Sequence, residues 1–182
     1  MVGDTLVDTT GTLPGLMESL VAAEWCLLQT MPVQGGFAIE VFAGTMVFTL
    51  GLLFACVPCL RPWDAQFGDQ FDVITNGQFL IELVKAGDIT AAHLATPCQS
   101  QTWARVPALR DWANIDGFPH LSAGQAMLVS SGNALAAFTG TFCQALYQGN
   151  GYFSIENPWR SWLWASADIL SLYALPGVSR YY

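Results

Sequence analysis

Residues 37–45, FAIEVFAGT, decide how this sequence folds. The run is apolar on both of its alternating faces except at Glu40, and it ends in the tight turn Ala43-Gly44. A strand that is apolar on both faces is typical of a parallel sheet, because helices cover both sides of such a sheet. This segment therefore predicts the first strand of an α/β domain.

The rest of the chain alternates short β-prone runs with helical patterns. We expect a second strand at the end of the stretch 37–60 and further strands at 71–75, 88–96 and 151–156. Apolar spacing predicts helices over 76–86, 122–148 and 162–172, and the segment 103–121 is expected to be a long loop. This βαβ rhythm predicts an incomplete doubly wound, mostly parallel sheet of about five strands with flanking helices.

The domain boundary is placed at residue 36. Residues 1–36 are interpreted as a leader followed by an amphipathic helix from Pro14 to Met31, which ends before Pro32. Residues 37–182 are long enough to form one α/β domain with a core of its own. We therefore place every candidate site residue in this second part.

A membrane span is the main structural alternative for residues 37–60, which contain only one charged side chain, Glu40. Gly44, Gly51 and Pro58 interrupt this stretch, which favours a strand, a helix and a second strand over a single helix. A subunit of a membrane complex that spans at 37–60 stays as the alternative.

Charge and cysteine content bear on partners and location. Six Lys and Arg against fourteen Asp and Glu give a net charge of -8, which argues against unaided binding to a nucleic-acid duplex. The chain has five cysteines, an odd number, and its start lacks the pattern of a signal peptide. These features predict an intracellular protein of the nucleus or the cytoplasm.

Several candidate binding residues follow the predicted strands, where doubly wound sheets bind their ligands. Phe42, Gly44 and Thr45 follow the first strand, and their turn leads into a helix N-terminus. Asp64 follows the second strand and is suited to accept hydrogen bonds from ribose hydroxyls, with a turn aspartate as the alternative. Asp72 either accepts from an adenine amino group or caps the next helix.

The next two predicted strand ends carry reactive groups. Pro97 and Cys98 follow the strand 88–96, and Glu156 and Asn157 end the strand 151–156. A thiolate is a strong nucleophile when its surroundings favour the ionised form, although a single cysteine beside a proline is also common as a structural thiol. Because neighbouring parallel strands end at one edge, we expect Cys98 and Glu156 to face the same crevice.

The order of these features resembles the cytosine-5 DNA methyltransferases over residues 37–172. The landmarks of that family are an F-x-G-x-G turn, a PCQ loop and an ENV strand end, and this chain has FAGT at 42–45, PCQ at 97–99 and IEN at 155–157. The resemblance implies that S-adenosylmethionine is the cofactor and that cytosine in DNA is the substrate. It also implies catalytic roles for Cys98, Glu156, Pro97 and Asn157, and cofactor contacts for Phe42, Gly44, Thr45, Asp64 and Asp72.

The chain also departs from the pattern of this family. Met46 replaces the second glycine of the turn, and the sequence ends at Tyr182, before the family's arginine-containing strand and target-recognition region. We therefore expect a truncated domain with an open sheet edge that a protein partner would cover. A non-catalytic, degenerate methyltransferase-fold protein that serves in binding or assembly is the second functional hypothesis.

One histidine and two arginines lie in or just after the strand 88–96. His93, inside the strand 88–96, is expected to be a satisfied core histidine rather than a general base. Arg105 and Arg110 are the cations of the loop after Cys98, and they are expected either to meet phosphate or to lie on a solvated loop face.

Overall fold

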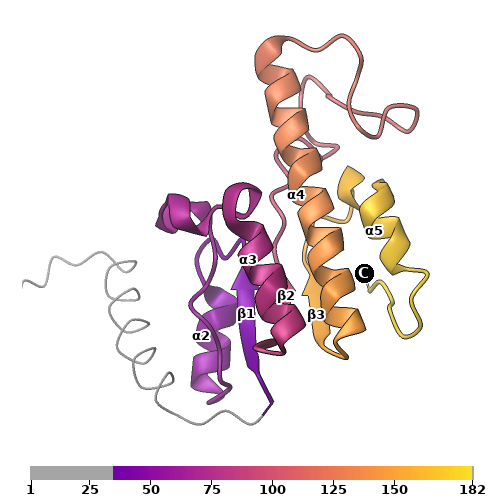
Figure 1. Cartoon of the computed structure of the whole chain (residues 1–182). Helices are drawn as coiled ribbons and strands as arrows, with labels where there is room; N and C mark the ends of the chain where they lie inside the picture. Colours follow the sequence, from indigo (N-terminus) through magenta and orange to yellow (C-terminus); the bar gives the residue numbers. More distant parts are fainter. Residues whose placement is uncertain (1–34, 182) are drawn as a thin grey trace, which may run out of the picture.

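The structure, a computed structural model, describes residues 35–181. Its sheet has three parallel strands in the order β1 (Phe37–Val41), β2 (Ile89–Leu94) and β3 (Tyr152–Ile155). The α-helices of this part of the chain are α2 (Val47–Phe54), α3 (Val73–Ala86), α4 (Ala123–Gln148) and α5 (Ala167–Leu172), and they flank the sheet (Figure 1). The chain is therefore a mixed α/β protein, as the sequence predicts.

Alternate residues of β1 face two different layers, as the pleat of a strand requires. Ile39 and Val41 belong to the buried core that they share with residues of α3 and α4. Glu40 points to the other side, where its carboxylate accepts hydrogen bonds from the backbone N–H and the hydroxyl of Thr49 in α2, both at 2.6 Å. In Figure 1, α3 and α4 lie side by side against the sheet. The helices thus cover β1 from both sides.

The second predicted strand is present only as an extended segment. Residues 58–63 run parallel to β1, with bridges from Ala38 to Cys59 and from Val41 to Trp63. The ladder between these bridges is irregular because Pro62 has no N–H to donate, and Trp63 N instead donates to Glu40 O at 2.8 Å. The segment 58–63 therefore lies beside β1 as a strand would, but its two isolated bridges do not make it a regular strand.

The third predicted strand, residues 71–75, is wrong. A short 3-10 helix, η2 (Asp69–Phe71), occupies its start, and α3 begins at Val73. Asp72 is the N-cap of α3, and its carboxylate accepts from Ile74 N at 2.9 Å. Capping satisfies a free amide of the first helical turn, and this outweighs the β-propensity of the local residues. With two of about five expected strands missing, the described residues form three.

The remaining predicted elements are confirmed with shifted ends. α3 contains the predicted helix 76–86, and α4 matches the predicted helix 122–148, with Ser122 and Gln125 forming a capping box at its start. The predicted helix 162–172 divides at Ser166 into a 3-10 helix, η3 (Trp162–Ala165), and α5. The predicted helix from Pro14 to Met31, and the leader that precedes it, lie outside the described residues.

Residues 37–60 do not form one long helix. This stretch forms β1, the eight-residue helix α2 and extended chain, so the alternative of a single spanning helix there is wrong. Among the described helices, α4 is long and apolar enough to cross a membrane by length and composition. The same helix packs against α3 on one side and α5 on the other (Figure 1).

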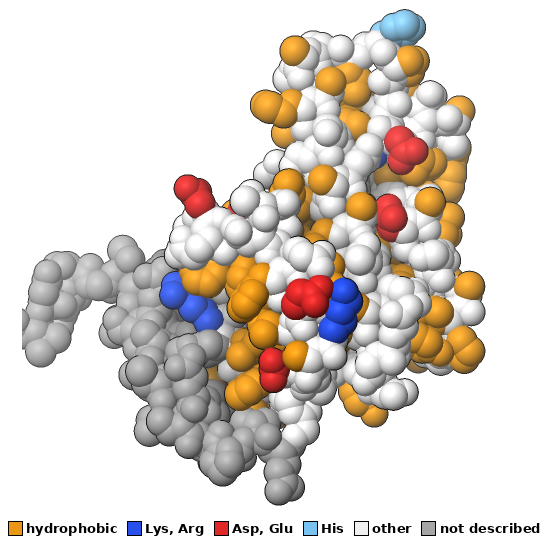
Figure 2. Space-filling model, in the orientation of Figure 1, with side chains coloured by type: hydrophobic (Ala, Val, Ile, Leu, Met, Phe, Trp, Pro, Cys, Tyr) orange, Lys and Arg blue, Asp and Glu red, His pale blue; other side chains and the backbone are white. Residues whose placement is uncertain are grey.

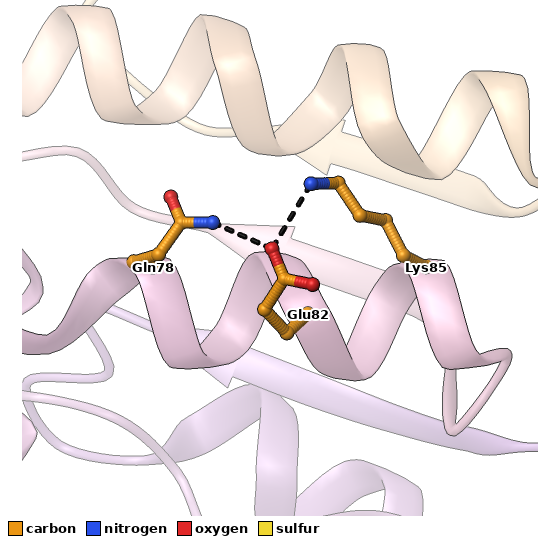
Figure 3. Close-up of polar contacts among 3 residues, drawn as sticks. All are labelled: Gln78, Glu82 and Lys85. Carbon is orange, nitrogen blue, oxygen red and sulfur yellow. Dashed lines mark hydrogen bonds and ion pairs between the residues drawn. The ribbon is translucent and has the colours of Figure 1, made fainter.

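The surface of the molecule carries few charges. Figure 2 shows hydrophobic side chains spread over one face, with acidic and basic side chains at isolated points. One polar cluster lies on α3, where Glu82 Oε1 accepts from Lys85 Nζ at 3.0 Å and from Gln78 Nε2 at 2.6 Å (Figure 3). The hydrogen bond from Lys85 lowers the pKa of Glu82. Such exposed pairs contribute little to stability.

Candidate functional site

The carboxyl ends of four neighbouring extended segments form one edge of the sheet. Phe42 N donates to Trp63 O at 2.7 Å, Ala95 N to Val41 O at 3.1 Å, and Glu156 N to Leu94 O at 2.8 Å. These bonds set the ends of 58–63, β1, β2 and β3 next to one another in that order. The predicted candidate residues after these segments therefore lie along a single edge.

The loop after β1 is tied to the loop after 58–63. Gly44 N donates to Asp64 Oδ2 at 3.0 Å, and Gln66 N donates to Asp64 Oδ1 at 2.9 Å. Phe42 is buried with φ 60°, and Gly44 has φ 49°, so the chain turns sharply between β1 and α2. Thr45, the next residue, is exposed. The sequence thus correctly placed these candidates side by side.

Asp72 lies at the start of α3, where both of its carboxylate oxygens are engaged. Oδ1 accepts from Ile74 N, and Oδ2 accepts from the Thr75 hydroxyl at 3.2 Å. The structure therefore gives Asp72 the capping role that the sequence allowed. Its contact with an adenine stays a prediction.

The Cys98 loop leaves β2 from a buried threonine. Thr96 is 2% exposed, and its hydroxyl lies 2.9 Å from the hydroxyl of Thr139 in α4. The carbonyl of Cys98 accepts from Gln101 N and Thr102 N, both at 2.9 Å, which folds the loop into a turn. Pro97 is exposed and Cys98 is partly buried. The thiol is therefore carried on a turn whose root is fixed to α4.

Glu156 and Asn157 follow β3 directly beside this loop. The side-chain amide of Asn157 donates to Thr96 O, which links the end of β3 to the root of the Cys98 turn. Asn157 Oδ1 is buried and has no hydrogen-bond partner among the described residues. Glu156 is exposed, so its carboxyl group is available to a ligand. The structure thus brings the two predicted catalytic segments into direct contact.

A buried arginine supports the Cys98 turn, and its role was predicted wrongly. Arg110 is 4% exposed, so it does not lie on a solvated loop face, and it donates to the carbonyl and hydroxyl of Ser100 at 3.0 and 3.1 Å. It also donates to Asn133 Oδ1 at 2.6 Å and to Val129 O at 3.1 Å, both in α4. Burial lowers the pKa of Arg110. An arginine inside a loop gives no sequence signal of burial, so this role was missed.

His93 lies on the α2 side of β2 rather than in the main core. Its ring stacks on Phe48 at a centroid distance of 4.6 Å, and Nδ1 lies 2.9 Å from the Ser154 hydroxyl. Burial lowers the pKa of His93, while the charges of Glu40 and Glu156 oppose that shift. Together with Glu40, His93 lines a cavity of about 430 Å³ beside α2. His93 therefore has a hydrogen-bond partner, as predicted, but the prediction that it lies in the core is wrong, because it is partly buried on the opposite face of the sheet.

The residues near Asp64 place a carboxylate and an aromatic ring beside an open turn. A Cβ added at Gly44 would meet no atom within 4 Å, so the turn is open to a ligand. Each oxygen of Asp64 accepts one amide and keeps a lone pair for a hydroxyl. Trp63 Nε1 is a buried donor without a partner in the described part of the chain, and its indole packs edge-on against Phe71. An aromatic surface and a carboxylate are thus adjacent.

The outer edge of β3 has no strand partner among residues 35–181. A cavity of about 700 Å³ lies along it, lined by β3, Glu156, Asn157, α5 and residues 176–181. An unpaired strand edge of this kind can accept another strand.

Comparison with known proteins gives no assignment. No protein-family model matches this chain, and neither a curated protein nor a solved structure was found to match it.

Proposed function

We propose that this chain is a methyltransferase-fold protein related to the cytosine-5 DNA methyltransferases, and that it transfers a methyl group to carbon 5 of cytosine. The observation that carries the proposal is the hydrogen bond from Asn157 to Thr96 O, because it joins the segment containing Glu156 to the turn containing Cys98. A nucleophile and a carboxyl group on adjacent strand ends can act on one base.

The arrangement of the chain around β1 supports the proposed fold. After β1, the chain adds 58–63 on one side of this strand and then β2 on its other side. Ligands of doubly wound sheets bind at the carboxyl ends of the strands where the order reverses in this way. Here that position is the edge between Gly44 and the Cys98 turn.

In the proposed reaction, the Cys98 thiolate forms a bond to carbon 6 of a cytosine that has left its stack. The electrons of the C5–C6 double bond move toward C5 and N3, and the Glu156 carboxyl group stabilises this charge by contacts with N3 and the exocyclic amine. Carbon 5 would then accept the methyl group, whose bond to the sulfur of the donor breaks so that the donor leaves as a neutral thioether. Loss of the C5 proton to water and departure of the thiolate restore the aromatic ring.

S-Adenosylmethionine supplies the activated methyl group when it is bound. Asp64 would hold its ribose hydroxyls, and Phe42, Gly44 and Thr45 would lie against the rest of the molecule. Pro97 would shape the turn, while Asn157 would fix the distance between the Cys98 turn and Glu156.

A non-catalytic role in binding or assembly is the second candidate. The free edge of β3 and the cavity beside it favour this role, because a partner strand would satisfy the exposed backbone groups there.

Calorimetry with S-adenosylmethionine and its demethylated product tests the cofactor step. We expect heat of binding with the wild type and a loss of about tenfold or more in affinity for Asp64→Ala, because one buried hydrogen-bond pair contributes about that factor. Asp88→Asn, at the amino end of β2, is the matched control and should bind normally. Absence of any binding by folded wild type would exclude a methyltransferase and leave the assembly role.

A further inference from the structure

An exposed aromatic cluster lies next to the candidate site. Trp103, Trp112 and Trp162 are in mutual contact, with ring centroids 4.8 Å apart for Trp103 and Trp162 and 5.2 Å apart for Trp112 and Trp162. Trp112 is 71% exposed and Trp103 is 43% exposed. Large exposed aromatic patches usually mark a binding surface.

The cluster borders a cleft of about 670 Å³, which is large enough for a nucleotide. Arg160 and Arg180 line this tryptophan cleft, and no acidic side chain of residues 35–181 does. Arg160 lies 5.9 Å from the Trp103 ring centroid, and Arg180 lies 4.6 Å from that of Trp164. Two of the six cations of an acidic chain are thus gathered at one aromatic surface.

The loops that carry Cys98 and Glu156 also build this cleft. Trp103 N donates to Arg160 O at 3.1 Å, and Trp162 N donates to Gln101 O at 2.8 Å. An antiparallel bridge joins Thr102 and Ser161 between them. The chain that follows the Cys98 turn and the chain that follows Glu156 thus meet at the tryptophan cleft.

Trp112 is held in place by its own turn. The Asp111 carboxylate accepts from Ala113 N at 3.0 Å and from Asn114 N at 2.8 Å. Such a turn fixes the backbone without burying the side chain. The exposed ring is therefore presented to solvent on an ordered segment.

We propose that the tryptophan cleft binds unpaired nucleobases, so that the substrate of the neighbouring site is a single-stranded nucleic acid rather than a duplex. This inference rests on the proposed function for the link to Cys98, although binding by the cleft does not require that chemistry. Base faces stack on tryptophan only when they are unpaired, and stacking gives affinity that does not depend on many phosphate contacts. A chain with a net charge of -8 needs that kind of affinity.

Other ligands fit the cleft less well. A quaternary ammonium group would be repelled by Arg160 and Arg180, although aromatic cages bind such groups elsewhere. A proline-rich peptide could pack on the aromatic surface, but it offers no anionic group to pair with the two arginines. A flexible single strand offers both base faces and phosphates.

Fluorescence anisotropy with labelled oligonucleotides tests the proposal. The protein carries Cys98→Ser, so that binding is measured without chemistry. We expect single strands to bind at least about tenfold more tightly than the matching duplex, and Trp112→Ala to weaken single-strand binding about tenfold. Arg160→Gln should reduce the slope of log affinity against log salt by about 0.7, for one lost phosphate contact.

Two variants serve as controls. Phe54→Ala removes an aromatic ring that is 89% exposed on the end of α2, and Arg61→Gln removes an exposed cation far from the cleft, so both should bind as the parent does. DNA and RNA single strands of the same sequence are compared, and the strand that binds more tightly shows which of the two nucleic acids the cleft prefers.

Equal affinity for single strands and duplex, or binding that survives Trp112→Ala, overturns the proposal, and so does binding of a proline-rich peptide in place of the oligonucleotide. Methyl transfer is measured separately on the wild type. Loss of transfer with intact single-strand binding would reject the proposed function and leave this cleft as a nucleic-acid site.

Discussion

Arg110 is the residue that fixes the Cys98 turn to the rest of the molecule. Its guanidinium joins Ser100 in that turn to Val129 and Asn133 in α4. Arg110→Gln leaves several buried acceptors without donors, so we expect the free energy of unfolding to fall by about 3 kcal/mol.

Urea unfolding measures this loss, with Arg61→Gln as the control. Arg61 is exposed and lies over the Phe71 ring, so its replacement should change the free energy of unfolding by less than about 0.5 kcal/mol. Equal stability of Arg110→Gln and the wild type would contradict the supporting role.

His93 should make the stability of the protein depend on pH. Its pKa in the folded protein lies below the ordinary value of 6.5, chiefly because it is buried, although Glu40 and Glu156 face it. The folded state therefore binds a proton less readily than the unfolded state, so stability is fully present above about pH 6.5 and falls as the pH drops below it.

Urea midpoints at about pH 7.5 and about pH 5.5 test this expectation. The difference between the two midpoints should shrink in His93→Gln. His120, the other histidine of the chain, is exposed, so His120→Gln should keep the wild-type difference. If the urea midpoint falls by the same amount between the two pH values in His93→Gln and in the wild type, His93 is not the titrating group.

At the scale of elements, α4 must approach the Cys98 turn closely. A Cβ added at Gly132 would lie 2.1 Å from the Ser100 hydroxyl oxygen, whereas one at Gly124 in the same helix would meet nothing within 4 Å. Gly132→Ala should therefore lower the free energy of unfolding by about 1–3 kcal/mol. Gly124→Ala, the matched control, should raise it by up to about 1 kcal/mol.

Thermal unfolding followed by circular dichroism compares the two variants. Equal melting temperatures of the two variants would show that α4 and the turn are not in close contact.

The sequence was most informative for elements with a long or regular pattern. The helix α4, with its capping serine, and the strands β1 and β2 were predictable because periodicity and apolar runs reflect their burial. The strand 71–75 was predicted wrongly because Asp72 acts as a helix cap, and 58–63 is incomplete because Pro62 cannot donate. Both errors concern one residue within an otherwise β-prone run.

The candidate site was partly predictable for a topological reason. Parallel strands end at one edge, so the positions of Gly44, Cys98 and Glu156 after their strands were enough to make them neighbours along that edge. The bonds that support them, from Thr96 to Thr139 and from Arg110 to α4, join segments far apart in the sequence. No local pattern encodes such contacts, so only the structure reveals them.

On the scale of the whole molecule, the tryptophan cleft and the cavity beside β3 are the two large hollows near the candidate site. The chain is acidic overall, yet the described residues that line the tryptophan cleft next to the Cys98 turn include two arginines and no acidic side chain. The cavity of about 700 Å³ along the free edge of β3 adjoins this cleft, because Trp164 and Arg180 line both of them. Substrate binding and partner binding would therefore use neighbouring surfaces of the same sheet end.

The central claim is that Cys98 is a nucleophile toward cytosine, and trapping tests it most directly. A single-stranded oligonucleotide with 5-fluorocytosine is incubated with the protein and S-adenosylmethionine, and the product is mapped by mass spectrometry. The fluorine cannot leave as a cation, so the covalent intermediate should accumulate on Cys98. Cys98→Ser should give no adduct, whereas Cys56→Ser, which removes an exposed thiol elsewhere, should give the wild-type amount. No adduct with folded wild type, or an adduct on another residue, would contradict the claim.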